Sequence, residues 1–234
     1  MTAFRTVLLA ILLLSSAPAF AADAAAPAKP PAMTPPVVSN DIAKAVAGTY
    51  TIDKSHAAIV FKVSHLGTSF YRGRYNDFDA KVVLDPAAPE KSTLEVTLNP
   101  ASVDTHNAKL EGEIRDWFKV TQFPTVTFKS TKITRTGPST GEIEGDLTML
   151  GQTHPLKLAA TFQGASTHMM KKTPVFGISA VGTLKRSTWG VSYGIPMVGD
   201  DVELQIDAEF DTPDAPVAVT PAAPVPAPAP APPK

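Results

Sequence analysis

Five histidines are the side chains best suited to metal or acid–base chemistry: His56, His65, His106, His154 and His168. No two of them have an H-x-H or H-x-x-x-H spacing, by which one strand or helix offers two ligands to a metal ion. His56 and His65 flank an expected strand, but their odd separation places them on opposite faces. The sequence therefore predicts no metal site and no cofactor, although residues distant in sequence could still meet in space.

Groups for covalent or acid–base catalysis are present, but no activated nucleophile is evident. Glu142 and Glu144 place two carboxylates on one strand face and Ile143 lies opposite, which indicates a solvated outer surface rather than a glycosidase cleft. Gly-rich phosphate loops are also absent. We therefore expect no enzyme activity and no catalytic residues. The rival is an enzyme that acts on a lipid, which would need convergent titratable groups inside the fold.

The clearest pattern in the chain is alternation of apolar and polar residues with a period of two. This period is typical of a strand with one buried face. The apolar members are Val202, Leu204, Ile206, Ala208 and Phe210, then Leu94, Val96 and Leu98, and then Leu156, Leu158, Ala160 and Phe162. Several antiparallel strands that share an apolar face must stack as two sheets or close into a barrel.

Other segments add strands and one helix. Further strands are expected over 48–53, 58–65, 70–76, 78–84, around 126–128, and over 142–150 and 176–185. Between them, Leu110, Ile114, Trp117 and Phe118 recur at helical spacing, which predicts one amphipathic helix over about residues 107–118. We therefore expect an all-β fold, a barrel of about eight antiparallel strands with one helix between strands.

The two ends of the chain differ from its middle. Arg5, an apolar run and Ala19-Phe20-Ala21 predict a signal peptide over residues 1–21, because the run is shorter than the roughly 20 residues of a membrane span. Residues 22–45 are rich in Ala and Pro and are interpreted as a linker, and residues 213–234 as a disordered Pro/Ala-rich tail. The folded domain is expected over residues 46–212.

Composition narrows the function further. The chain has no cysteine, so it can form neither disulfides nor a thiolate metal site. Its formal net charge is −1 and the domain has no basic run, so the electrostatic footprint of a nucleic-acid binder is missing. With the signal peptide, these features predict a periplasmic or secreted protein. The oligomeric state is left open, a homodimer included.

Apolar side chains are the better candidates for a functional site. Those expected to face inward are Phe61, Phe128, Met149, Leu158, Phe162, Phe176, Ile178 and Phe210, and the helix adds Trp117 and Phe118. An eight-stranded barrel is just wide enough to be filled by side chains or to hold one small ligand. Periodicity alone does not choose between a packed interior and a cavity.

Short sequence blocks in this region resemble those of the YceI family, in the family's order. They are Asp53-Lys54-Ser55-His56, residues 61–67, Arg72-Gly73-Arg74-Tyr75, Val103-Asp104-Thr105, Asp116-Trp117-Phe118 with Phe123-Pro124, Gly145-Asp146-Leu147-Thr148, and residues 186–190. The resemblance spans about residues 48–210. It departs at Ser187-Thr188-Trp189, where the family usually has x-Asp-Phe, and at Lys119, where Asp is common.

The resemblance implies a lipocalin-like barrel with an open tunnel that binds a polyisoprenoid or another long-chain amphiphilic lipid. We therefore expect a non-catalytic periplasmic carrier. Burial of the lipid chain would supply roughly 0.8 kcal/mol per methylene. Its polar end would lie near His65, Tyr71 and Arg186, with the helix and strand-edge aromatics at the opening. A stress-response scaffold with a filled barrel is a second rival, and transient membrane contact is left open.

Overall fold

The structure is a computed structural model that describes residues 34–212. The predicted signal peptide, residues 22–33 of the predicted linker and the predicted tail lie outside the described residues. The described part contains ten strands and one α-helix. They are β1 (Gly48–His65), β2 (Ser69–Tyr75), β3 (Phe78–Leu84), β4 (Thr93–Leu98), β5 (Val103–Asp104), α1 (Ala108–Trp117), β6 (Val126–Arg135), β7 (Thr140–Met149), β8 (Gln152–Thr167), β9 (Pro174–Lys185) and β10 (Val198–Asp211).

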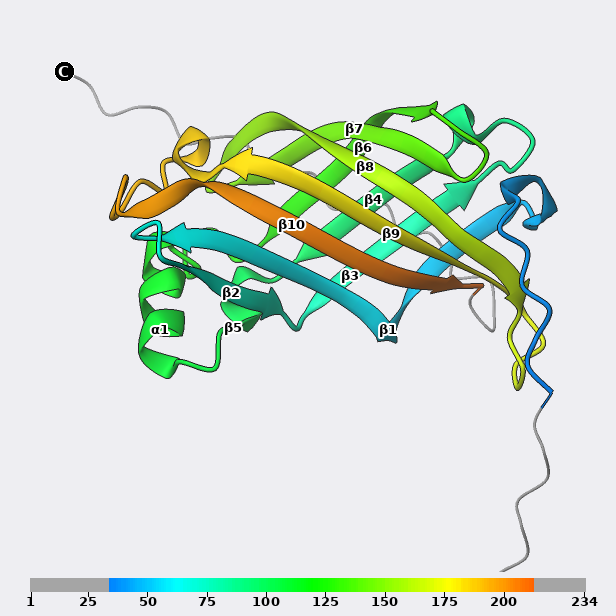
Figure 1. Cartoon of the computed structure of the whole chain (residues 1–234), viewed down its shortest axis with the longest axis horizontal. Coiled ribbons are helices and arrows are strands. Elements are labelled where there is room, and N and C mark those ends of the chain that lie inside the picture. The colour runs from blue at the N-terminus through cyan, green and yellow to red at the C-terminus, as the bar shows by residue number, and fades with distance from the viewer. Residues whose placement is uncertain (1–33, 213–234) are drawn as a thin grey trace, which may run out of the picture. The chain divides into compact units, whose positions relative to one another are not determined.

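Eight of these strands form a closed barrel (Figure 1). The order around the wall is β10-β9-β8-β7-β6-β4-β3-β1, and β1 pairs back onto β10, so the sheet has no free edge along this circuit. Every neighbouring pair is antiparallel. Closure satisfies the backbone groups that an edge strand would leave unpaired. The predicted all-β fold, an antiparallel barrel of about eight strands with a single helix, is confirmed.

Strand β1 is longer than expected, because the sequence predicts two strands over this range. The pairing with β10 shifts between Ile52 and Ala57, where the intervening residues of β1 oppose Glu209 alone. This is a large β-bulge in which four residues oppose one, and it bends the strand without ending it. The polar run Asp53-Lys54-Ser55-His56 hides this continuity in the sequence, since it breaks the apolar alternation.

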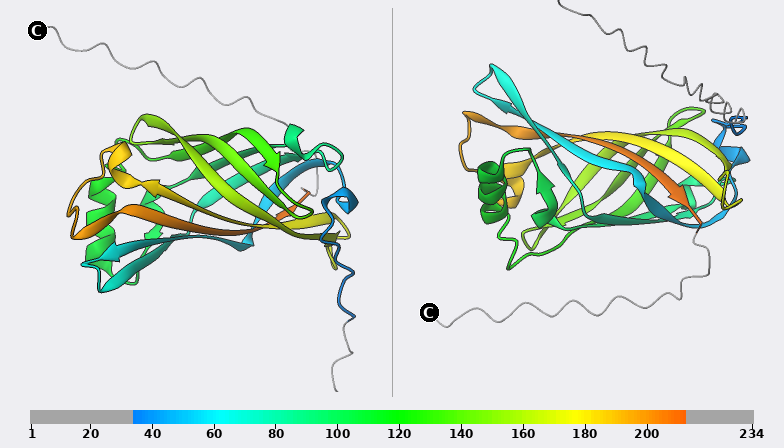
Figure 2. Two further views of the ribbon diagram at one scale, coloured as in Figure 1. Left: turned by 45° about the horizontal axis from the view of Figure 1, so that its top comes forward. Right: turned by 90° about the horizontal axis from the view of Figure 1, so that it is seen from below.

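The two halves of β1 have different neighbours. The first half pairs with β3 and the second with β2, so β2 and β3 act as one bent partner strand. β2 also pairs with the short β5 through Arg74 and Tyr75. The helix α1 follows β5 and lies at this end of the barrel, at the left in Figure 1 and in both views of Figure 2.

Helix α1 is capped at its start by Asn107, and Arg115 ties it to the segment that precedes it. The Asn107 side chain accepts a hydrogen bond from the N–H of Leu110 at 3.2 Å, which caps the first turn. Arg115 donates to the carbonyls of Ala101 at 2.9 Å and Val103 at 3.3 Å. The buried Ile114 packs against β1 and β5.

The buried side chains gather in three clusters. One gathers around Tyr50, Phe176 and Phe210, a second around Phe128 and Leu158, and a third around Phe61 under the helix. Partly buried residues pack against two clusters at once: Leu94 and Val96 join the first two, and Phe118 and Leu204 join the second and third.

Residues just before β1 also contact the barrel. Ser39 exchanges two backbone hydrogen bonds with Ala165, at 3.0 and 2.8 Å. Ile42 and Ala45 pack against the cluster around Tyr50. The C-terminal end of the range predicted as linker thus lies on the barrel, while the domain boundaries remain predictions. Within residues 34–212, no helix has the length and apolarity needed to cross a membrane.

Candidate ligand-binding tunnel

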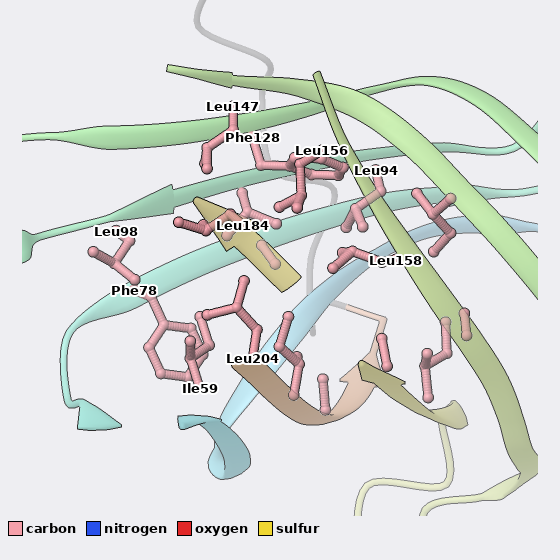
Figure 3. Close-up of a pocket in the computed structure, with 18 of the residues that line it drawn as sticks. Ile59, Phe78, Leu94, Leu98, Phe128, Leu147, Leu156, Leu158, Leu184 and Leu204 are labelled. Atoms are coloured by element: carbon pink, nitrogen blue, oxygen red, sulfur yellow. The ribbon is translucent and has the colours of Figure 1, made fainter. Parts of the chain in front are cut away.

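An internal cavity of about 430 Å³ runs inside the barrel. All eight barrel strands contribute to its lining, and Figure 3 shows leucine, isoleucine and phenylalanine side chains that point into one shared space. Cavities that hold small ligands measure roughly 300–1,000 Å³, so the size suits a ligand. The structure therefore has an interior that side chains do not fill.

The predicted strand faces point into this cavity. Every apolar member of the alternating segments in β4, β8 and β10 borders it. So do all nine side chains predicted to bind the apolar part of a ligand: Phe61, Trp117, Phe118, Phe128, Met149, Leu158, Phe162, Phe176 and Ile178. The seven strand residues lie where the period of two places them, and Trp117 and Phe118 come from the helix and its C-cap. The contact of these side chains with a ligand remains a prediction.

Three aromatic residues border the cavity at the helix end, and we call this end the aromatic mouth: Tyr71, Trp117 and Tyr193. The Trp117 and Tyr193 rings are stacked, with centroids 5.0 Å apart and an interplanar angle of 26°. The Tyr71 ring packs against His65 at 4.7 Å. Tyr193 was not among the predicted residues, because nothing in its loop sequence signals that the chain returns to α1.

The three residues predicted for the polar end differ in their surroundings. Tyr71 and Arg186 border the cavity, whereas His65 does not. Arg186 is buried, and its guanidinium donates to the carbonyls of Val191, Val198 and Gly199 at 2.8–2.9 Å. Burial lowers the pKa of Arg186. In the structure this arginine ties together the connection between β9 and β10, and a contact with a headgroup remains a prediction.

The other end of the cavity is bordered by the turn between β6 and β7 and the loop between β3 and β4. Gly137 to Gly141 spells G-x-S-x-G, a pattern typical of nucleophilic serines. Here it forms a turn between two strands, not the strand-to-helix elbow that such a serine requires. Ser139 accepts a hydrogen bond from the N–H of Phe162 through its carbonyl, at 2.7 Å.

Few titratable groups reach the cavity. Among the described residues, its charged lining side chains are Glu113, Arg135 and Arg186, and no histidine borders it. Arg135 donates to the carbonyls of Gly137 and Pro138 within its own turn. The lining therefore offers little for acid–base chemistry but much apolar surface for binding.

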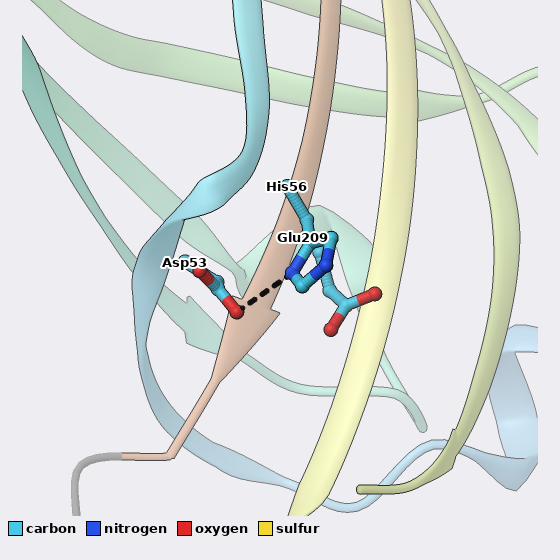
Figure 4. Close-up of side chains that lie close together, drawn as sticks. All are labelled: Asp53, His56 and Glu209. Carbon is cyan, nitrogen blue, oxygen red and sulfur yellow. Dashed lines mark hydrogen bonds and ion pairs between the residues drawn. The ribbon is translucent and has the colours of Figure 1, made fainter.

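A separate polar cluster lies at the bulge of β1, outside the cavity lining (Figure 4). Nδ1 of His56 is 3.0 Å from Oδ2 of Asp53, and ligand atoms of Asp53, His56 and Glu209 lie within 4.8 Å of one another. The other Asp53 oxygen accepts from the N–H of Ser55 at 2.8 Å.

The charges of this cluster support one another. The hydrogen bond with Asp53 raises the pKa of His56, and the same bond lowers the pKa of Asp53. The spacing of histidines alone did not show this group, because its third member is on the last strand. Asp53 and His56 bridge the bulge with their hydrogen bond, and Glu209 lies beside them. The absence of a metal remains a prediction.

A closed eight-stranded antiparallel barrel around an apolar cavity is a lipocalin-like architecture, with an interior that has room for a ligand. The chain belongs to the YceI-like domain family, which it matches over residues 50–210.

Two proteins of this family show how far the similarity extends. A UPF0312 protein of Ectopseudomonas mendocina is 40% identical over 174 residues, covering 71% of this chain and 88% of the relative. The crystal structure of the Campylobacter jejuni YCEI protein is 29% identical with a TM-score of 0.59, covering 65% of this chain and 91% of that one.

A more distant structure shares the fold. It is a polyisoprenoid binding domain from Saccharophagus degradans, 14% identical with a TM-score of 0.56. The match covers 70% of this chain and 98% of that domain.

Proposed function

We propose that this protein is a non-catalytic carrier that holds a polyisoprenoid or another long-chain amphiphilic lipid in its barrel, after export to the periplasm or secretion. The observation that carries the proposal is the apolar cavity bordered by all eight strands. A lipid chain that leaves water for such a space gains roughly 0.8 kcal/mol per methylene. No bond of the lipid needs to be made or broken.

Other observations support the same proposal. The S. degradans structure with this fold is a polyisoprenoid binding domain, and we carry that ligand class to this chain as part of the proposal. Few titratable side chains line the cavity, which favours binding of a lipid over its chemical conversion. We place the polar end of the lipid at the aromatic mouth, where Tyr71 and Tyr193 carry hydroxyl groups.

The proposal is tested by the lipid content of the native protein. Protein purified without detergent from its own host is extracted with organic solvent and the extract is analysed by mass spectrometry, with a fluorescent polyisoprenoid analogue titrated in parallel. We expect close to one long-chain lipid per protein, or saturable binding of the analogue with one site. Absence of lipid together with no binding of the analogue would contradict the proposal, as would chemical conversion of the analogue.

The location has its own test. N-terminal sequencing of the protein from the periplasmic or culture fraction should show a chain that begins near Ala22. Recovery of a chain that still begins at Met1, in membrane fractions only, would contradict export as a soluble carrier.

A further inference from the structure

Exposed apolar side chains gather around the aromatic mouth, on the hairpin end between β1 and β2 and on the loop between β9 and β10. They are Leu66, Phe70, Tyr71, Tyr193, Ile195 and Met197, each between 36% and 66% exposed, and we call them the rim patch. They account for six of the thirteen exposed large apolar side chains among the described residues, so the apolar surface is concentrated at this end. The two loops touch, since the Leu66 N–H donates to the Met197 carbonyl at 2.7 Å.

These loops carry almost no charge. Residues 187–199 contain no Asp, Glu, Lys or Arg, and neither do residues 63–71, whose titratable side chains are His65 and Tyr71. Charged groups are costly in the apolar part of a bilayer, so two uncharged loops can approach it at little cost. The exposed methionines at the opposite end, Met169 and Met170, are instead followed directly by Lys171 and Lys172.

The backbone of the β9–β10 loop is largely satisfied from within. Arg186 donates to three of its carbonyls, those of Val191, Val198 and Gly199. The N–H groups of Ile195 and Val198 donate to the carbonyls of Ser192 and Gly194. Unpaired backbone groups are what normally keeps irregular loops out of a lipid phase. Because many backbone groups of this loop already have hydrogen-bond partners, the loop can enter the interfacial region of a membrane.

The rim patch is continuous with the cavity, because Tyr71 and Tyr193 belong to both. We propose that this end of the barrel docks on a lipid bilayer, with the rim patch in the interface, so that the ligand passes between membrane and tunnel without crossing water. Tyrosine and tryptophan favour this interface, since each has an apolar body and a polar tip. This inference rests on the proposed lipid ligand.

The experiment measures flotation of the purified protein with phosphatidylcholine vesicles. The test variant L66S/M197S removes two rim side chains that do not border the cavity. Its matched control is M169S/M170S, which removes two exposed apolar side chains at the opposite end. We expect the partition coefficient of the test variant to fall at least tenfold, and the control variant to float like the wild type. Binding should persist in 0.5 M NaCl, since the rim carries little charge.

Two further measurements separate the outcomes. The test variant should retain the wild-type melting temperature and the wild-type affinity for a fluorescent polyisoprenoid analogue in the absence of vesicles. Wild-type protein that binds the analogue but does not float would overturn docking while leaving the carrier proposal intact. Equal losses in the two variants would overturn it as well. Concentration-dependent dimers that only L66S/M197S disrupts, with no flotation, would assign the rim patch to a second copy of the chain.

Discussion

The ring of Phe61 on β1 lies directly against the backbone of Gly73, its pairing partner on β2. A Cβ atom added to Gly73 would collide with this ring and would lie 2.9 Å from Cγ2 of Thr105. Because Gly73 has no Cβ atom, the Phe61 ring can pack against its backbone at the cavity wall. A glycine inside a strand often marks a bend or bulge, whereas the pairing of β1 with β2 is regular at Gly73.

The substitution G73A should push Phe61 toward the cavity. We expect a loss of about 1–3 kcal/mol in the free energy of unfolding, measured by denaturant melts, because overpacking forces side chains and backbone apart. The control is G112A in α1, where an added Cβ has nothing within 4 Å. Alanine in a helix interior is favoured over glycine, so G112A should stabilise by about 0.5–1 kcal/mol. Wild-type stability of G73A would contradict this reading of the contact.

Narrowing the tunnel should separate binding from stability. Ile178 borders the cavity and Val181 on the same strand is exposed on the outer face. We expect I178W to weaken binding of a fluorescent polyisoprenoid analogue at least tenfold with a small change in stability, because a cavity has room that a packed core lacks. V181W should bind like the wild type. A loss of about 1–3 kcal/mol in I178W would show instead that the interior is tightly packed at this position.

The equivalent change on the neighbouring strand is F162W, because Phe162 on β8 pairs with Ile178 on β9. Phe162 is buried and borders the cavity beside Phe176, with ring centroids 6.1 Å apart. The added ring volume should again reduce analogue binding, measured by fluorescence titration. Unchanged binding in both tryptophan variants would place the ligand elsewhere.

The bulge of β1 should give stability a specific pH dependence. The Asp53 hydrogen bond raises the pKa of His56 in the folded protein above its ordinary value of 6.5. Its contribution to stability is therefore fully present below pH 6.5 and is lost as pH rises through the raised pKa. Melting temperatures of H56Q should lack this decline. H106Q is the control, because the His106 side chain is 94% exposed, and it should keep the wild-type profile.

A metal at the same cluster would give a different result. Addition of zinc or of a chelator should leave the melting temperature of the wild-type protein unchanged. A zinc-dependent rise that is absent in H56Q would contradict the prediction of no metal.

Arg186 should be needed for the structure of the β9–β10 connection. Lysine cannot reproduce its planar fork of donors, so R186K leaves buried carbonyls of this loop without partners. We expect a loss of about 2–4 kcal/mol in the free energy of unfolding, from the cost of unsatisfied buried acceptors. R72K, at an exposed position on β2, is the control and should be near neutral. A fully stable R186K would show that the three hydrogen bonds are dispensable.

The sequence by itself determined the class of fold and the inward faces. Alternation in β4, β8 and β10 identified side chains that do border the cavity, because successive residues of a strand must point to opposite sides. The helix expected over about 107–118 is found at Ala108–Trp117, since its apolar spacing and its cap are local features. The split of β1 into two strands was wrong, because the continuity across the bulge is set by the pairing with β10, which the local sequence does not show.

Only the tertiary structure decided whether the interior is filled and what surrounds each end. Closure depends on the pairing of β1 with β10, which brings together residues as distant in sequence as Thr51 and Asp211. The same long-range pairing sets Glu209 beside His56, and the path of the β9–β10 loop stacks Tyr193 on Trp117. No local pattern encodes such contacts, because they follow from the register and curvature of the whole barrel. The volume of the cavity is likewise the space that the barrel encloses minus the volume of the side chains that point into it.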